Sequence, residues 1–157
     1  MELEREINLT FVTTADPATT LALLGDVPEA SRHMPDVARV EATADGHRWT
    51  MKKLGMGKVS HQAVYCSEFI TDAANGTVTW GARRDLGNSW AHGAWTVRAE
   101  GAGAHVHLCS SFGVQMPVPA MLRSMALKVF EREYTRLMSA YCDHLKRTLD
   151  GGDGRLR

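Results

Sequence analysis

Apolar and polar residues alternate along the first segment of the chain, and near its end they follow a helical period instead. Leu3, Ile7, Leu9 and Phe11 alternate with polar residues. This period of two is typical of a half-buried strand and predicts one over residues 4–14. Over residues 119–149 apolar residues recur at steps of three and four, which predicts a helix of roughly 30 residues and about 45 Å. Such a helix needs a broad apolar partner, so we expect a curved sheet that grips it.

Turn and capping residues divide the rest of the chain. Asp16-Pro17 and Gly25 bound a short helix over residues 17–25, and a second one over residues 27–33 ends at Met34-Pro35. Glycine-containing turns then delimit six short strands, at residues 37–44, 47–54, 58–70, 77–83, 89–99 and 104–115. The predicted fold class is α+β: a seven-stranded curved antiparallel sheet wrapped around a long C-terminal helix, with two short helices between the first two strands. We expect a single domain over residues 1–150 and a flexible, glycine-rich tail over residues 151–157.

Composition narrows the classes of partner and compartment. The chain has 157 residues, with 18 Lys plus Arg against 18 Asp plus Glu, so its balanced charge argues against a nucleic-acid partner. Cys66, Cys109 and Cys142 are odd in number and widely spaced, which suggests neither a disulfide framework nor a zinc site. The N-terminus lacks the pattern of a secretion signal, and no apolar run reaches the ~20 residues needed to span a bilayer. We therefore expect a cytoplasmic protein with no integral membrane segment and no cofactor; the sequence does not define its oligomeric state.

The element order and four local segments resemble a known superfamily. The segments are ASRHMPDVARVE after the short helices, KLGMGKVSHQ, GNSWAHGAWTV and VPAMLRSM at the start of the long helix. Over residues 3–149 the chain resembles the helix-grip fold of the START and birch-pollen-allergen superfamily, also called SRPBCC, which includes polyketide cyclase/dehydrase-like proteins. KLGMGKVSHQ and GAWTV look closer to the branch that contains accessory proteins of carbon-monoxide dehydrogenase. The resemblance implies an apolar cavity between the concave face of the sheet and the long helix.

Strand register identifies which side chains would line such a cavity, because charged positions should face outward. On the helix we expect the half from Leu122 to Phe130 to face the ligand or the entrance, and the half from Tyr134 to Leu149 to seal the far end. An ordinary filled core would use the same tryptophans and methionines, so that alternative stays open. The predicted ligand-binding residues are Trp49, Met51, His61, Tyr65, Trp80, Trp95, Ser110, Phe112, Met121, Met125, Val129 and Phe130.

Few of these residues carry chemistry. His61 beside Tyr65 is the candidate catalytic pair, since an imidazole can exchange a proton during enolisation or dehydration; a hydrogen-bonded core histidine explains His61 equally well. Ser110 lacks a nucleophile motif and is interpreted as a polar contact. Glu133 either borders the cavity or forms a salt bridge on the flank of the helix.

A metal site is not predicted. His105 and His107 share one face of a strand, at a spacing that can converge on a metal, but no third ligand is evident.

Three functional hypotheses follow. The first is a carrier or accessory protein that binds a hydrophobic small molecule, which is aromatic, polyketide-like or isoprenoid-like. The second is a cofactor-independent enzyme resembling polyketide cyclases, aromatases and dehydratases, in which cavity shape and a few polar residues promote cyclisation. The third is a protein-interaction module.

Overall fold

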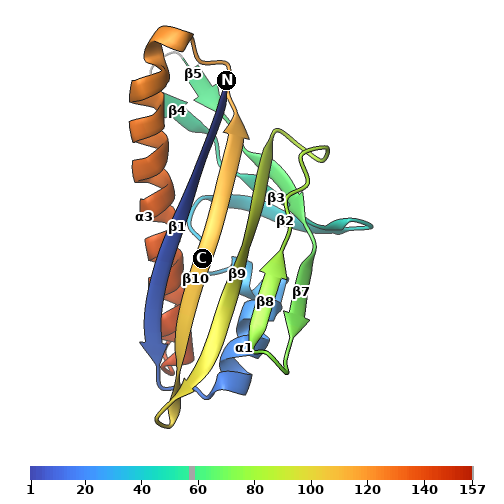
Figure 1. Ribbon diagram of the computed structural model, residues 1–157, viewed down its shortest axis with the longest axis vertical. Helices are drawn as coiled ribbons and strands as arrows, with labels where there is room; N and C mark the ends of the chain where they lie inside the picture. Colours follow the sequence, from blue (N-terminus) through green and yellow to red (C-terminus); the bar gives the residue numbers. More distant parts are fainter. Residues whose placement is uncertain (57–58, 157) are drawn as a thin grey trace.

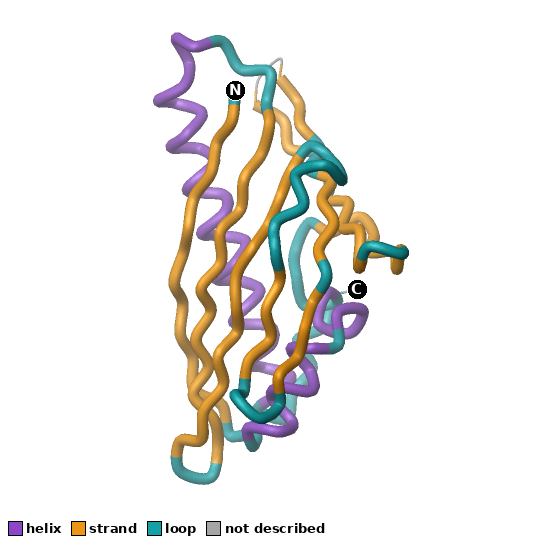
Figure 2. Tube along the Cα trace, turned by 45° about the vertical axis from the view of Figure 1, so that its right-hand side comes forward, coloured by secondary structure: helices purple, strands orange, loops and turns teal. Residues whose placement is uncertain are grey.

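An antiparallel sheet and a long helix dominate the computed structural model, which describes residues 1–56 and 59–156. The largest sheet has five strands in the order β1-β10-β9-β8-β7: β1 (Glu2–Thr13), β7 (Phe69–Asp72), β8 (Thr77–Trp80), β9 (Ser89–Glu100) and β10 (Gly103–Gln115). The α3 helix (Arg123–Leu149) follows a 3-10 turn, η1 (Ala120–Leu122), and crosses behind these strands (Figures 1 and 2). The fold class predicted from the sequence is confirmed.

Two smaller groups of strands complete the enclosure. A three-stranded sheet has the order β2-β3-β6, with β2 (Val37–Thr43), β3 (Gly46–Met51) and β6 (Val64–Ser67). A separate hairpin joins β4 (Leu54–Met56) to β5 (Val59–His61) and lies at the end of the molecule where α3 begins (Figure 1). Gly46, with φ of 119°, and Gly76, with φ of 66°, occupy two of the predicted turns in backbone conformations that favour glycine.

The prediction of one continuous strand over residues 58–70 is wrong. Its first position, Lys58, lies outside the described residues, and the rest forms β5, β6 and β7. The break at Glu68 lets the chain change partners, because β6 pairs with β3 whereas β7 pairs with β8. Asn88 spans the other break, between β5 and β6: its side chain accepts from the Val64 amide at 2.9 Å and donates to the Gln62 carbonyl at 2.9 Å. The predicted single seven-stranded sheet is therefore divided into three sheets.

Two short helices close the lower end of the main sheet. In α1 (Pro17–Gly25) the Asp16 carboxylate accepts from the Thr19 amide at 2.7 Å, and in α2 (Val27–Ser31) Asp26 accepts from the Glu29 amide at 3.2 Å. Both are N-caps of the kind the sequence predicted for the first helix. The second helix ends two residues earlier than the predicted boundary at His33.

The C-terminal tail packs onto the domain, which differs from the expected frayed end. The Leu156 amide donates to the Arg32 carbonyl at 2.7 Å, and the Gly154 amide donates to the Thr148 hydroxyl at 2.8 Å. Gly154 is buried against the backbone of His144, where there is no room for a side chain. These contacts hold the tail beside α2 through residue 156.

Candidate functional site

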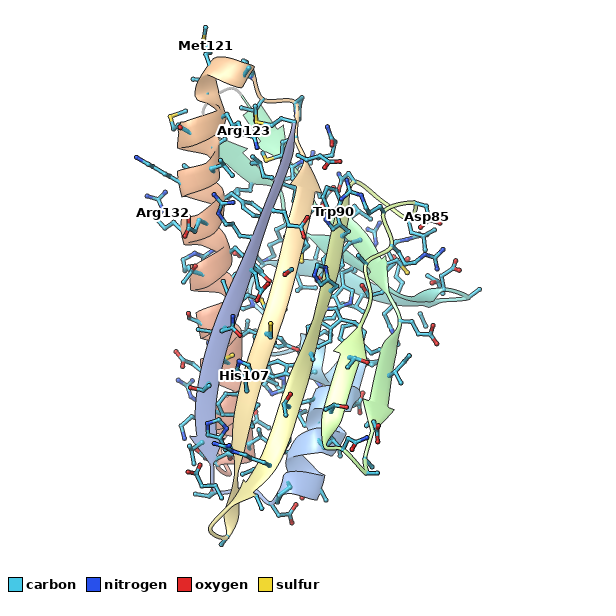
Figure 3. The ribbon with its side chains drawn as sticks, viewed as in Figure 1. Asp85, Trp90, His107, Met121, Arg123 and Arg132 are labelled. Carbon is cyan, nitrogen blue, oxygen red and sulfur yellow. The ribbon has the colours of Figure 1, made fainter. Side chains whose placement is uncertain are left out.

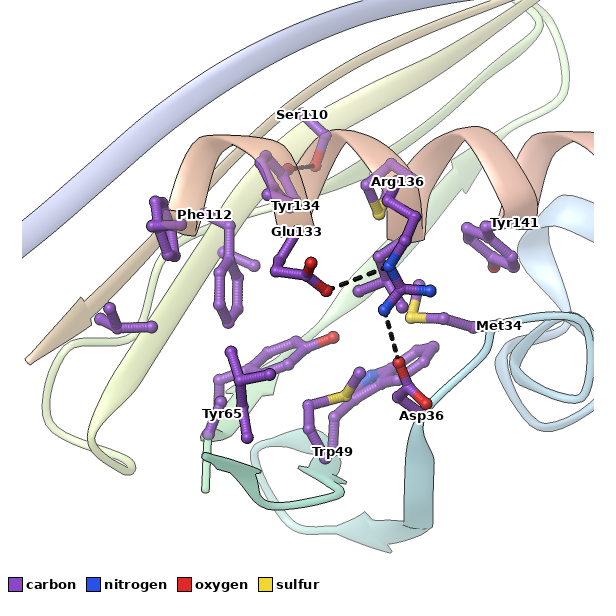
Figure 4. A pocket seen from close by; sticks show the side chains of 18 of the residues that line it. Met34, Asp36, Trp49, Tyr65, Ser110, Phe112, Glu133, Tyr134, Arg136 and Tyr141 are labelled. Carbon is purple, nitrogen blue, oxygen red and sulfur yellow. Dashed lines mark hydrogen bonds and ion pairs between the residues drawn. The ribbon is translucent and has the colours of Figure 1, made fainter. Parts of the chain in front are cut away.

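A cavity of about 350 Å³ lies between the sheets and α3 (Figure 4). Small-molecule sites in proteins typically measure about 300–1,000 Å³, so this volume suits a small ligand. Its wall combines residues from every layer of the fold. The described lining residues are Met34, Asp36, Trp49, Met51, Lys52, Lys53, Leu54, His61, Ala63, Tyr65, Phe69, Trp80, Ala91, Trp95, Leu108, Ser110, Phe112, Val114, Met116, Phe130, Glu133, Tyr134, Arg136, Leu137, Met138 and Tyr141.

Strand register explains how the sheet residues reach the cavity. Trp49 on β3 lies directly opposite Tyr65 on β6, and on the main sheet Trp95 lies opposite Leu108. Alternate residues of a strand share a face, so the residues two positions before and after each of these four also face the cavity side of the sheet. The following predicted residues line the cavity as expected: Trp49, Met51, His61, Tyr65, Trp80, Trp95, Ser110, Phe112 and Phe130.

The aromatic side chains form a connected wall. The Trp49 and Tyr65 rings stack with centroids 5.8 Å apart and an interplanar angle of 9°. Tyr65 meets Phe112 edge to face at 5.1 Å, and Phe112 stacks with Phe130 at 6.3 Å. Such offset and edge arrangements are favourable for aromatic rings, and they leave flat apolar faces toward the cavity.

On the helix, the residues that line the cavity begin at Phe130, about two turns later than the predicted start at Leu122. They fall at Phe130, Glu133, Tyr134, Leu137, Met138 and Tyr141, which are steps of three and four along one face of α3. Met121, Met125 and Val129 are not among the lining residues, and the first two are 88% and 57% exposed. The expectation that these three residues contact a ligand in the cavity is therefore corrected. The reason is geometric: the first turns of α3 extend beyond the upper end of β9 (Figure 1).

Three tyrosines, Tyr65, Tyr134 and Tyr141, bring phenolic hydroxyl groups to the cavity lining. Tyr134 donates to the Ser110 hydroxyl at 2.8 Å. Burial raises the pKa of Tyr65, Tyr134 and Tyr141 above the usual value for tyrosine, so all three phenols stay protonated at neutral pH. The Tyr65 hydroxyl points into the cavity (Figure 4), and it has no hydrogen-bond acceptor among the described residues. A neutral phenol in this position can donate to an oxygen of a ligand.

His61 lines the same cavity in a desolvated environment. Burial lowers its pKa, which favours the neutral imidazole. Its Nε2 atom is covered and has no hydrogen-bond partner among the described residues. The interpretation of His61 as an ordinary hydrogen-bonded core histidine is thus not supported at Nε2. A neutral imidazole is the form required of a general base.

A chain of charged groups crosses one side of the cavity (Figure 4). The Arg136 Nε atom donates to Glu133 at 3.0 Å, and its terminal nitrogen donates to Asp36 at 2.9 Å. Among the described residues, Asp36 is the one non-glycine residue with a positive φ, which is 61°. It follows Pro35 in the loop after α2. Glu133 therefore does both things the sequence allowed, because it borders the cavity and forms a salt bridge.

Sequence reasoning missed Asp36 and Arg136 as parts of this site. The three-residue spacing of Glu133 and Arg136 is visible in the sequence as a helix ion pair. The Met34-Pro35-Asp36 segment also carried a turn signal. The contact between Asp36 and Arg136, however, joins residues that are 100 positions apart, and no local sequence pattern predicts it.

The remaining histidine candidates lie on the outer face of the main sheet. His107 contacts the Asn8 side-chain oxygen through its Nε2 atom at 3.0 Å. Over residues 1–56 and 59–156, no group of three or more His, Cys, Asp and Glu side chains is arranged to hold a metal ion.

None of the described helices is long and apolar enough to cross a membrane.

Comparisons with known proteins agree with this architecture. A family model described as "Polyketide cyclase / dehydrase and lipid transport" matches residues 4–149. No curated protein sequence matches significantly. The closer likeness to the carbon-monoxide-dehydrogenase branch, inferred from local segments, remains a prediction.

Several solved structures share the fold. TTHA0849 from Thermus thermophilus has a TM-score of 0.66 and 20% identity, covering 90% of this chain and 97% of its own. The Zhui aromatase/cyclase from Streptomyces sp. R1128 has a TM-score of 0.64 and 16% identity, covering 95% and 99%. A START superfamily protein from Mycobacterium smegmatis has a TM-score of 0.61 and 14% identity, covering 86% and 92%. At these identities the likeness establishes the fold alone.

Proposed function

The chain belongs to the polyketide cyclase/dehydrase and lipid transport family, and within that family we propose that it binds a flat, hydrophobic small molecule in the cavity between its sheets and α3. The observation that carries this proposal is the cavity of about 350 Å³ with a connected aromatic wall. Ligand pockets of this kind combine a mostly apolar wall with a few polar groups that orient the ligand. The role would be that of a carrier or accessory protein.

The polar groups narrow the ligand chemistry. Tyr65 is a neutral donor, and Arg136 is already paired with two carboxylates, Glu133 and Asp36. A ligand with carbonyl or phenolic oxygens can accept from the phenol without needing a free cation. The unpaired cations of the lining, Lys52 and Lys53, are exposed to solvent, so a carboxylate buried beside Tyr65 would lack a paired cation, and an unpaired buried charge is costly. We therefore favour a planar keto or phenolic compound over a fatty acid.

Titration with 1,8-dihydroxyanthraquinone tests the proposal, because Trp49, Trp80 and Trp95 line the cavity and report on it through their fluorescence. We expect saturable quenching, a one-to-one complex by native mass spectrometry, and weak competition by palmitate. Two variants on β9 provide a matched pair: Ala91→Leu fills the cavity, whereas Ala94 lies three residues along the strand on the opposite face. Equal affinity in Ala91→Leu and Ala94→Leu, or no saturable binding by the wild type, would contradict the proposal.

A second candidate function, a cyclase or dehydratase, is favoured by one observation. His61 is held neutral in the cavity that Tyr65 also lines. His61 would remove a proton from a methylene between two carbonyls, and the resulting enolate carbon would attack a distant carbonyl to form the carbon–carbon bond. Tyr65 would donate its proton to the new alkoxide. The Tyr65 phenolate would then remove the remaining proton of the attacking carbon, and the His61 imidazolium would protonate the hydroxyl as it leaves as water, which forms the double bond and restores both side chains. This sequence needs no oxidant, reductant or cofactor.

Mass spectrometry of products from a synthetic poly-β-keto thioester distinguishes the enzyme from the carrier. An enzyme is expected to accelerate cyclisation over buffer, and His61→Gln or Tyr65→Phe should each slow it by about 100-fold or more, the usual contribution of a positioned acid or base. The same variants should still bind the anthraquinone if they fold normally. Cyclisation at the buffer rate would leave the carrier role and exclude this enzyme activity for that substrate.

A further inference from the structure

Three large apolar side chains are exposed where α3 begins. Met121, Leu122 and Met125 are 88%, 37% and 57% exposed, and we call them the apolar tip. Figure 3 shows Met121 projecting away from the body of the molecule at this end. Scattered exposed apolar residues are ordinary, but three within five positions at a projecting end form a patch that needs a partner.

The charges around this tip are cationic. Arg123 and Lys128 are exposed on α3, and Lys52 and Lys53 are exposed in the cavity lining just before β4, whose hairpin lies at the same end of the molecule (Figure 1); we call these four residues the basic collar. None of the four has an ion-pair partner among the described residues. Residues 46–67 and 101–130 contain no Asp or Glu. The balanced charge of the whole chain therefore hides a local excess of positive charge.

Acidic side chains near the same end are mostly compensated. Glu2 pairs with Arg84, which also lies over the Trp90 ring, and Glu131 pairs with Arg5 at 3.6 Å. Glu4 accepts a hydrogen bond from the Trp90 indole at 3.1 Å. The neutral indole does not cancel the charge of Glu4, so the four unpaired positive charges of the basic collar outnumber this one unpaired carboxylate.

We infer that the chain docks reversibly on anionic lipid bilayers through the apolar tip and the basic collar. Flexible methionine side chains can enter the boundary between head groups and acyl chains, while Lys and Arg stay at the level of the lipid phosphates. A projecting tip suits a deformable surface such as a bilayer better than the flat area that a protein partner would need. Because Lys52 and Lys53 also line the cavity, docking brings its rim to the lipid surface.

Vesicle flotation measures this docking without any cavity ligand. The purified chain is mixed with vesicles of phosphatidylcholine alone or of equimolar phosphatidylcholine and phosphatidylglycerol, at low and at high salt. We expect flotation with the anionic vesicles at low salt, a strong loss at high salt because ions screen the collar, and little flotation with phosphatidylcholine alone. Absence of flotation with the anionic vesicles would overturn the inference.

Variants separate the two parts of the surface. Lys128→Glu changes the charge by two units and is expected to lower the partition coefficient by roughly tenfold or more, since each Lys or Arg near an anionic surface contributes about 1 kcal/mol. Met121→Ser with Met125→Ser should also reduce flotation. The matched controls are Arg98→Glu on β9 and Ile70→Ser on β7, which are exposed away from the tip and should bind like the wild type.

Other outcomes would contradict the inference. Equal losses in the control variants would show that flotation does not depend on this surface. A wild-type dimer in solution that the methionine variants dissociate would identify the tip as a contact between two copies of the chain. The inference is independent of the proposed function, because Ala91→Leu should lose the anthraquinone and keep normal flotation.

Discussion

Two consecutive stretches, the end of η1 with the first turns of α3 and then the rest of α3, both carry apolar side chains but have different environments. The first, residues 121–129, exposes Met121 and Met125 and buries Ala126 against a small cluster formed with Leu3, Val114 and Met116. The second, residues 130–149, lines the cavity and then enters the main core, where Leu145 is fully buried. An apolar stripe thus identifies a helix and its inner face, but it does not say which turns the rest of the fold covers.

Truncating one side chain in each stretch gives the largest expected difference. Leu145→Ala should lower the free energy of unfolding by about 2–5 kcal/mol, because it opens a cavity in the fully packed core. Met125→Ala removes a side chain that is 57% exposed and should change stability by less than about 0.5 kcal/mol. Urea denaturation measures both. Comparable losses would mean that the two stretches are equally packed.

Adding bulk tests the same contrast through ligand binding. Leu137→Trp places a larger side chain into the cavity wall and should weaken anthraquinone binding by about tenfold or more, as expected when a ligand loses its space. Met125→Trp, outside the cavity, should leave the affinity unchanged, which is the reverse of the expectation from the sequence. Fluorescence titration of the two variants decides between these views. Weaker anthraquinone binding in Met125→Trp alone would show that the first turns of α3 contact the ligand.

In the second stretch, removing a hydroxyl group should affect stability differently for a hydrogen-bonded tyrosine and for one without a partner. Tyr134→Phe deletes the hydrogen bond to Ser110 and should cost about 0.5–1.5 kcal/mol. Tyr141→Phe should cost nothing measurable, because that hydroxyl has no hydrogen-bond partner among the described residues. Thermal and urea unfolding of the pair provide the measurement. Equal effects would show that burial of the ring, and not the hydrogen bond, dominates at both positions.

The smallest effect concerns His61 and pH. Burial lowers the pKa of His61 in the folded state below its ordinary value of 6.5, so the unfolded chain binds the proton more readily. The free energy of unfolding should therefore fall as the pH drops below 6.5, and His61→Gln should weaken this dependence. Urea unfolding of both proteins across this pH range measures the difference. Parallel pH profiles would show that His61 is not desolvated.

Local patterns predicted most of the fold. The period of two found β1, glycine-containing turns bounded β9 and β10, and Asp16-Pro17 correctly placed the start of α1. The break at Glu68 escaped prediction because β6 and β7 are both extended, and only their partners differ. Strand propensity acts on single residues and their neighbours, whereas the choice of partner depends on segments far along the chain.

In the candidate site too, the residues set by local patterns were predicted and those set by long-range contacts were not. Register placed Trp49, Tyr65 and Phe112 on one inner wall, because alternation along a strand is a local property. Asp36 and Arg136 were missed, since their contact joins a loop to a helix across 100 residues of sequence.

By itself, the sequence determined the class of fold, the elements and the face that each strand turns inward, because these depend on periodicity, capping and turn chemistry within a few residues. The tertiary structure decided which turns of α3 meet the cavity and how widely separated charges meet. It also decided that Met121 and Met125 project beside the basic collar instead of facing a ligand. The physical reason is that burial belongs to the packed assembly: an apolar side chain is covered only where other segments are long enough, and close enough, to exclude water from it.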